Sequence, residues 1–103
     1  MSLYNNLTAS VICPTCKNES VVEMQVYFGL KNFLDYKIGD RVQWLPQKAV
    51  RNGGRPPDGS MLSDGYGICP VCGHDFFVPI EISNDRIVRI AHELARPGYD
   101  KRE

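Results

Sequence analysis

The four cysteines of the chain fall into two nearly identical phrases, ICPTC at residues 12–16 and ICPVCGH at residues 68–74. Each phrase places two cysteines three positions apart, so that one tight turn can present two thiolates to the same ion. Four thiolates from two such turns can surround a zinc ion as a tetrahedron, at metal–sulfur distances of roughly 2.3 Å. The sequence therefore predicts one metal site, formed by Cys13, Cys16, Cys69 and Cys72.

The residues around the cysteines are those that a metal-binding turn requires. Pro14 and Pro70 follow the first cysteine of each pair and preset the backbone of the turn. Gly73 follows the last cysteine and can adopt a positive φ at no steric cost. The first turn has Lys17 at the corresponding position, so either Lys17 accepts a less favoured backbone or Asn18 takes over that conformation.

Three other uses of paired cysteines compete with zinc. A redox C-x-x-C pair of the thioredoxin kind begins a helix, whereas strand-like sequence follows both pairs here. Structural disulfides suit a secreted chain, and MSLYNNLTAS does not have the pattern of a secretory signal. Iron stays open as the rival metal, because the same four thiolates bind it. We expect one zinc ion per chain.

The sequence pattern of the segments that follow the two cysteine pairs predicts β-strands. In ESVVEMQVYF, residues 19–28, apolar and polar side chains alternate with the period of a half-buried strand. DFFVPIEI, residues 75–82, shows the same alternation, and RIVRI, residues 86–90, resumes it after the turn residues Ser83-Asn84-Asp85. This predicts a carboxy-terminal hairpin, in which Pro79 indicates an edge strand because it cannot donate a ladder hydrogen bond.

The stretch between the two cysteine pairs has a different character. Gly39-Asp40 lies between two short runs of β-forming residues in DYKIGDRVQW, residues 35–44, which predicts a hairpin or a sharp bend. Residues 46–65 are rich in proline and glycine and predict a long mobile loop. We interpret residues 30–65 as an insertion into a single domain of residues 1–92, followed by a loosely held tail of residues 93–103.

Composition limits the class of protein. A chain of 103 residues with 43% hydrophobic residues suits one domain with a modest core. No stretch approaches the roughly 18 apolar residues of a membrane span, and we expect a soluble, cytoplasmic protein. The formal net charge is zero, although residues 31–55 carry a local excess of +4. Nothing global therefore indicates a nucleic-acid or membrane partner.

The two cysteine turns resemble those of the zinc-ribbon, or rubredoxin-like, group, in which C-P-x-C-G knuckles lie on adjacent β-hairpins. The matching residues are 13–16 and 69–73 with their flanking strands, about half of the chain. The order of knuckle, strand, YKIGDRV, long loop, knuckle and hairpin is also similar to small uncharacterised bacterial zinc-ribbon proteins. The resemblance implies a mainly β zinc ribbon with an inserted hairpin and long loop. The 52 residues between the pairs exceed the usual rubredoxin spacing, which weakens an electron-transfer function.

A catalytic function is not expected. Four cysteine ligands leave no open position for a metal-bound water, and no P-loop, G-x-S-x-G or H-E-x-x-H motif occurs. His74 is expected to be a surface or supporting residue, and His92 lies in the tail with no nucleophile near it in sequence.

We expect instead a binding module in which the metal is structural. Aromatic and arginine side chains are typical of protein interfaces. The candidate partner-binding residues of the insertion are Tyr36, Arg41, Trp44, Arg51 and Arg55. Tyr36 and Trp44 could instead pack over the ribbon. Two other functions stay open: nucleic-acid binding, which steep salt dependence would reveal, and electron transfer through iron, which the colour of the purified protein would reveal.

Overall fold

The computed structural model describes residues 4–46 and 48–98. This part of the chain forms seven β-strands and three short 3-10 helices, which confirms the predicted mainly β fold. The strands are β1 (Asn5–Ile12), β2 (Glu19–Val26), β3 (Asp35–Tyr36), β4 (Met61–Ile68), β5 (Asp75–Ser83), β6 (Arg86–Ile90) and β7 (Arg96–Pro97). The 3-10 helices are η1 (Val50–Asn52), η2 (Pro57–Gly59) and η3 (His92–Leu94).

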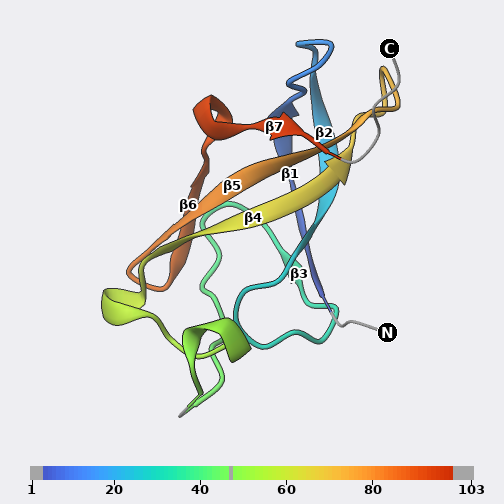
Figure 1. The fold of residues 1–103 in the computed structure, drawn as a ribbon. Coiled ribbons are helices and arrows are strands. Elements are labelled where there is room, and N and C mark those ends of the chain that lie inside the picture. The colour runs from blue at the N-terminus through green and yellow to red at the C-terminus, as the bar shows by residue number, and fades with distance from the viewer. Residues whose placement is uncertain (1–3, 47, 99–103) are drawn as a thin grey trace.

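Two long antiparallel hairpins, β1–β2 and β4–β5, form the centre of the sheet. The strand order is β3-β1-β2-β4-β5-β6, and β7 pairs with β5 outside this path. Strands β2 and β4 join the hairpins through the pairs Gln25–Tyr66 and Val26–Gly65. The β1–β2 turn and the β4–β5 turn, which carry the two cysteine pairs, therefore lie at the same end of the molecule (Figure 1).

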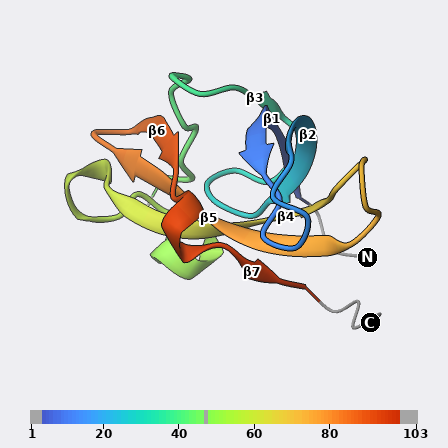
Figure 2. The same cartoon turned by 90° about the horizontal axis from the view of Figure 1, so that it is seen from above.

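The sheet curves until its two ends meet. The segment that follows β3 hydrogen-bonds to the β5–β6 hairpin, with Gly39 N–H donating to Ile87 O at 2.7 Å and Ile87 N–H donating to Asp40 O at 3.0 Å. Val42 N–H donates to Asp85 O at 2.7 Å. Seen from above, the strands surround a common interior (Figure 2). The core therefore lies inside the curved sheet, which the irregular segment of residues 39–42 closes against the β5–β6 hairpin.

The core is filled by the inward face of each long strand. Val22, Met24 and Val26 of β2 are buried, as their alternation predicts, and β5 contributes Phe76 and Ile80 in the same way. Burial of an aliphatic or aromatic side chain of this size stabilises a fold by about 1.5–3 kcal/mol. Cys13 and Cys69 belong to the same cluster, so the cysteine turns are continuous with the core.

A buried asparagine in β1 fixes the start of the insertion. The Asn5 side chain is fully buried. Its Nδ2 donates to Phe28 O at 3.1 Å and to Leu30 O at 2.8 Å. Its Oδ1 accepts from Asn32 N–H at 3.1 Å and from Leu34 N–H at 3.0 Å. One side chain thus satisfies four backbone groups of a loop, which removes the cost of burying them unpaired.

The insertion is more ordered than its composition predicts. The bend at Gly39-Asp40 is present, with Asp40 N–H bonded to Lys37 O, but Gly39 and Asp40 bond to Ile87 of β6. Residues 61–65, which we expected in the mobile loop, begin β4. Within residues 46–60, η1 and η2 form two short turns, and Gly53, Gly54 and Gly59 are buried. Glycine lets the backbone pack where a Cβ would collide with a neighbouring residue.

The prediction that Pro79 marks an edge strand is wrong. The carboxy-terminal hairpin itself is confirmed as β5–β6, but β5 is paired on both sides. Strand β6 pairs with β5 from Ile80 onward and β7 pairs with Phe76 and Phe77, so Pro79 lies between the two partners. Its carbonyl accepts from Ala91 N–H at 2.9 Å. Neither the β6 ladder nor the β7 ladder extends over Pro79, so the N–H that proline lacks is not required on that side of β5.

The first residues of the expected tail pack on the sheet. Helix η3 is followed by β7, which pairs with β5 through Phe76–Pro97 and Phe77–Arg96. Gly98 N–H donates to Asp75 O at 3.1 Å. Residues 99–103 of the predicted tail lie outside the described residues. In residues 4–46 and 48–98, we find no helix with the length and hydropathy required to cross a membrane.

Candidate metal centre

Each cysteine pair occupies the turn of a long hairpin. Cys13 and Cys16 follow β1 and precede β2, whereas Cys69 and Cys72 follow β4 and precede β5. The two turns lie at one end of the molecule because β2 and β4 are neighbours in the sheet (Figure 1). The sheet topology thus brings together residues that are more than fifty positions apart in sequence.

The two turns have the same backbone hydrogen bonds. Lys17 N–H donates to Cys13 O at 3.0 Å, and Gly73 N–H donates to Cys69 O at 2.9 Å. The hairpin above each turn is closed in the same way: Cys13 N–H donates to Asn18 O, and Cys69 N–H donates to the carbonyl of His74. The near-repeat in sequence is therefore a repeat in structure.

Backbone N–H groups also point at the first sulfur of each pair. Thr15 N–H donates to Cys13 Sγ at 3.4 Å, and Val71 N–H donates to Cys69 Sγ at 3.4 Å. Such bonds stabilise thiolates, because a backbone dipole offsets part of the negative charge of the sulfur. The prolines between these residues, Pro14 and Pro70, preset the turn that aims the two amides.

Lys17 adopts the left-handed conformation that the second turn gives to glycine. Its φ is 66°, and the φ of Gly73 is 78°. Of the two possibilities that the sequence leaves open, Lys17 rather than Asn18 carries the unfavourable backbone. A residue with a Cβ costs roughly 1–2 kcal/mol in this region. The first turn therefore holds a strained lysine where the second is relaxed.

The four sulfurs form a compact cluster. All four Sγ atoms lie within 4.8 Å of one another. Cys13 Sγ lies 3.7 Å from Cys72 Sγ, and Cys16 Sγ lies 3.6 Å from Cys69 Sγ. Metal–sulfur bonds of about 2.3 Å in a tetrahedron place sulfurs roughly 3.8 Å apart. All four cysteines are free of disulfides, so the cluster can hold a metal ion with four thiolate ligands.

The cysteines differ in burial and in acidity. Cys13 and Cys69 are 2% exposed, whereas Cys16 and Cys72 are partly exposed. Hydrogen bonds from the backbone and side chain of Asn18 lower the pKa of Cys16 to about 6. The backbone of His74 lowers the pKa of Cys72, but burial and hydrogen bonds with the other cysteines raise it to about 11. A lowered pKa favours the thiolate form of Cys16, which is the form that binds a metal ion.

The two histidines are not part of the sulfur cluster. The group of neighbouring metal-ligating side chains around these cysteines contains four cysteines and no histidine. His74 contributes its backbone carbonyl to the second turn. His92 begins η3, on the far side of β5 from the β1–β2 hairpin. His74 Nδ1 and His92 Nε2 are buried and have no hydrogen-bond partner among the described residues.

Three of the five candidate partner-binding residues converge on Asp85, in the β5–β6 turn. Trp44 Nε1 donates to Asp85 Oδ1 at 2.8 Å. Arg55 donates to both oxygens of the same carboxylate, from Nε at 2.7 Å and from Nη2 at 3.2 Å. Arg41 Nη2 lies 3.9 Å from Asp85 Oδ2, and its side chain is 69% exposed. These groups thus anchor the insertion to the carboxy-terminal hairpin.

The other two candidates have different surroundings. Tyr36 is 4% exposed, its ring packs 5.5 Å from that of Phe28, and its hydroxyl accepts from Gln43 N–H at 3.1 Å. Burial raises the pKa of Tyr36. The backbone of Arg51 lies in η1, and its side chain lies outside the described part of the chain. Packing within the protein is therefore the observed role of Tyr36, and contact of these residues with a partner stays a prediction.

Sequence reasoning missed the two polar groups that organise the fold, Asn5 and Asp85. Asn84-Asp85 was identified as turn chemistry, and both residues have positive φ, 50° and 68°. The excess of basic residues in 31–55 is the one sequence feature that is compatible with a carboxylate partner such as Asp85 from another part of the chain. Nothing in the sequence around Asn5 indicates burial.

Comparison with protein-family models gave no matching family, and comparisons with curated proteins and with solved structures gave no match either. The assignment of this centre therefore rests on the four sulfurs, their spacing and the turns that hold them.

Proposed function

We propose that the chain is a non-catalytic module that binds one structural zinc ion through Cys13, Cys16, Cys69 and Cys72 and mediates an interaction with another protein. The observation that carries the proposal is the convergence of four free thiols at tetrahedral spacing. The d-electrons of Zn²⁺ impose no coordination geometry on the site. Structural zinc sites hold the ion with four ligands, such as thiolates, in a tetrahedron. A complete set of four thiolates leaves no position for substrate or water.

The position of the centre supports a structural role. In the described part of the chain, β2 and β4 pair at two positions, Gln25–Tyr66 and Val26–Gly65. Both positions are at the end of β2 that is distant from Cys13 and Cys16. Toward the cysteines the two hairpins are joined by side-chain packing and by the sulfur cluster. An ion bound to all four sulfurs would tie the free ends of the hairpins together.

A protein partner fits the surface better than a nucleic acid does. The net charge is zero, and Arg41 and Arg55 of the basic insertion lie beside Asp85 of the same chain. Exposed apolar side chains next to the cysteines in sequence are Ile12, Ile68 and Val71. Apolar side chains of this kind can contribute to the core of a protein interface.

Metal analysis tests the zinc assignment. Native mass spectrometry of the purified chain should find one zinc ion per chain, and the protein should be colourless, because zinc–thiolate sites do not absorb visible light. The His92→Ala variant is the matched control and should keep the ion, because His92 is not in the sulfur cluster. A folded protein without metal, or a coloured protein that carries iron as isolated, would contradict the proposal.

A further inference from the structure

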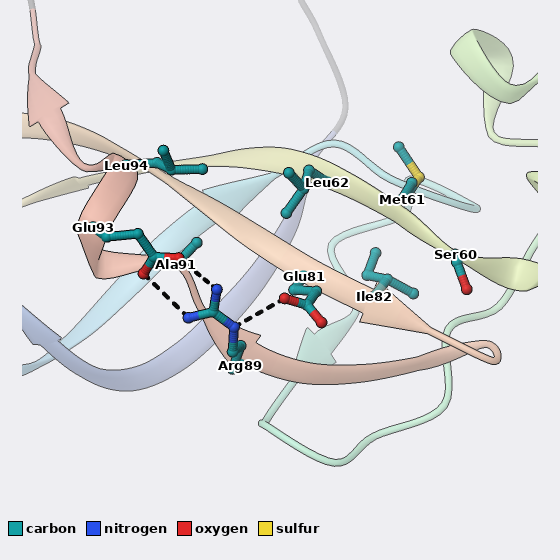
Figure 3. Close-up of a pocket in the computed structure, with 9 residues that line it drawn as sticks. All are labelled: Ser60, Met61, Leu62, Glu81, Ile82, Arg89, Ala91, Glu93 and Leu94. Atoms are coloured by element: carbon teal, nitrogen blue, oxygen red, sulfur yellow. Dashed lines mark hydrogen bonds and ion pairs between the residues drawn. The ribbon is translucent and has the colours of Figure 1, made fainter.

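A second site of interest is a pocket of about 540 Å³ on the part of the sheet that β4, β5 and β6 form. It is formed by β4, β5, β6 and η3 (Figure 3). Its lining residues are Ser60, Met61, Leu62, Glu81, Ile82, Arg89, Ala91, Glu93 and Leu94. None of them is a cysteine of the metal centre or one of the candidate partner-binding residues.

One side of the pocket is apolar. Leu62 and Leu94 are 55% and 49% exposed, whereas Ile82 and Ala91 below them are buried. Leu62 lies on the outward face of β4, because side chains alternate across the sheet and its neighbour Met61 is turned toward the core cluster. The two leucines thus form an exposed apolar side of the pocket, and Ile82 and Ala91 beside them are buried in the protein.

The other side of the pocket carries three charges. Strand pairing places Glu81 of β5 opposite Arg89 of β6, and Arg89 Nε donates to Glu81 Oε1 at 2.9 Å. Arg89 Nη1 and Nη2 donate to the two oxygens of Glu93, at 3.2 Å and 2.5 Å (Figure 3). Two carboxylates share one guanidinium, so the wall keeps a net charge of −1.

The least occupied acceptor on this wall is Glu81 Oε2. Arg89 donates one hydrogen bond to each oxygen of Glu93 and one to Glu81 Oε1, and among the described residues Glu81 Oε2 accepts none. A guanidinium binds best to two parallel oxygens of one carboxylate, and Arg89 already holds both oxygens of Glu93 and one oxygen of Glu81. A compact ammonium with three rotatable donors can bind to one oxygen.

We propose that this pocket binds a lysine side chain of the protein partner, with its methylenes against Leu62 and Leu94 and its ammonium on Glu81. A lysine combines an apolar stem with a cationic end, which matches one apolar and one anionic wall. Charge complementarity also selects against an anionic residue. This inference rests on the proposed protein-interaction function, but it does not depend on which metal is bound.

The test uses blocked amino acids as probes of the zinc-loaded protein. In an NMR titration, Nα-acetyl-lysine amide should shift the signals of Leu62, Ala91 and Leu94 in a saturable way. Nα-acetyl-norleucine amide, which has a similar stem and no charge, should bind about fivefold more weakly, as expected for the loss of one exposed ion pair. Nα-acetyl-arginine amide should also bind more weakly than the lysine derivative.

Two variants locate the binding. Glu81→Gln should reduce the affinity for the lysine probe about fivefold. Glu23→Gln makes the same change at an exposed glutamate of β2, away from the pocket, and should leave the affinity for the lysine probe unchanged. The inference is overturned if the lysine probe does not bind, if norleucine or arginine derivatives bind equally well, or if Glu81→Gln has no effect. Metal content is measured on the same samples, so that loss of zinc, which would contradict the proposed function, is distinguished from loss of probe binding alone.

Discussion

Lys17 shows how one residue departs from an otherwise repeated turn. It occupies the left-handed position that Gly73 holds in the second turn, and its N–H makes the same hydrogen bond. Its side chain is exposed, so no packing compensates for the strain. The position is therefore suited to a substitution that changes the backbone energy without disturbing the core.

We predict that Lys17→Gly stabilises the metal-bound protein. Glycine removes a strain of roughly 1–2 kcal/mol but adds freedom to the unfolded chain, which leaves a net gain of about 0.5–1 kcal/mol. Chemical denaturation with zinc in excess measures the free energy of unfolding. Lys17→Ala retains a Cβ and should show no such gain. A lower stability for Lys17→Gly than for Lys17→Ala would contradict the role assigned to the backbone.

At the scale of elements, the β5–β6 turn holds the insertion. Ser83 and Arg86 are paired, and the two residues between them both have positive φ, as in the tight turns that suit a twisted hairpin. The carboxylate of Asp85 accepts from Trp44 and Arg55, while its backbone accepts from Val42 N–H. A local turn thus becomes the attachment point of a distant segment.

We predict that Asp85→Asn loosens the insertion without unfolding the sheet. Asparagine tolerates the left-handed backbone but lacks the charge and one acceptor that bind Arg55. Trypsin should then cut at Arg41 or Arg51 sooner than in the parent, because Pro56 blocks cleavage after Arg55. The fluorescence of Trp44 should also shift to longer wavelength. Glu23→Gln, which changes an exposed carboxylate elsewhere, should behave as the parent. Equal cleavage rates for Asp85→Asn and the parent would exclude the anchoring role.

The same anchor should weaken in acid. Hydrogen bonds from Arg55 and Trp44 lower the pKa of Asp85 in the folded protein. A carboxyl group whose folded pKa lies below its unfolded value stabilises the fold fully above the unfolded value, near pH 3.9. This contribution is lost as the pH falls from there through the lower folded pKa. At each pH the parent and Asp85→Asn are compared with the same acid-active protease, because loss of metal in acid affects both proteins. The difference in cleavage rate between the two proteins should shrink only below about pH 4.

At the scale of the whole molecule, a metal ion bound to the four cysteines would close a long loop of the chain. Cys16 and Cys69 are separated by 52 residues, which include β2, β3 and β4. Holding both ends on one ion reduces the freedom of the unfolded chain. Structural zinc in small fingers binds with roughly 10–16 kcal/mol, whereas typical domains have only about 5–15 kcal/mol of stability. The ion can therefore decide whether the sheet forms.

We predict that Cys69→Ser, or a strong chelator, abolishes cooperative thermal unfolding. A serine hydroxyl is a poor substitute for a thiolate ligand, and Cys69 is also buried in the core cluster. Calorimetry and circular dichroism follow the transition. His92→Ala, which leaves the four sulfurs intact, should unfold cooperatively near the temperature of the parent. Cooperative unfolding of Cys69→Ser within a few degrees of the parent would show that no structural metal is needed.

Much of the fold near the cysteines could be predicted, because its signals are local. The two C-P-x-C turns, the alternation in β2 and the β5–β6 hairpin are each encoded within about ten residues. Strands β1 and β4 gave no comparable signal. β1 buries the polar Asn5, and β4 contains Gly65 and Gly67 at inward positions. A Cβ on Gly67 would lie 3.0 Å from Met24 and Val22, so this glycine reflects packing between hairpins.

The sequence by itself determined the four cysteines that can hold a metal ion, the turns that present them and the mainly β class, because each depends on residue type and short spacing. The tertiary structure decided where the insertion goes: Asn5 binds its first residues, β6 pairs with its bend, and Asp85 anchors Trp44 and Arg55. These contacts join residues 25 to 48 positions apart, from Asn5 with Leu30 to Gly39 with Ile87. The residues next to a side chain in sequence do not specify which distant residue it will contact. These contacts are defined only when the curved sheet brings the two residues together.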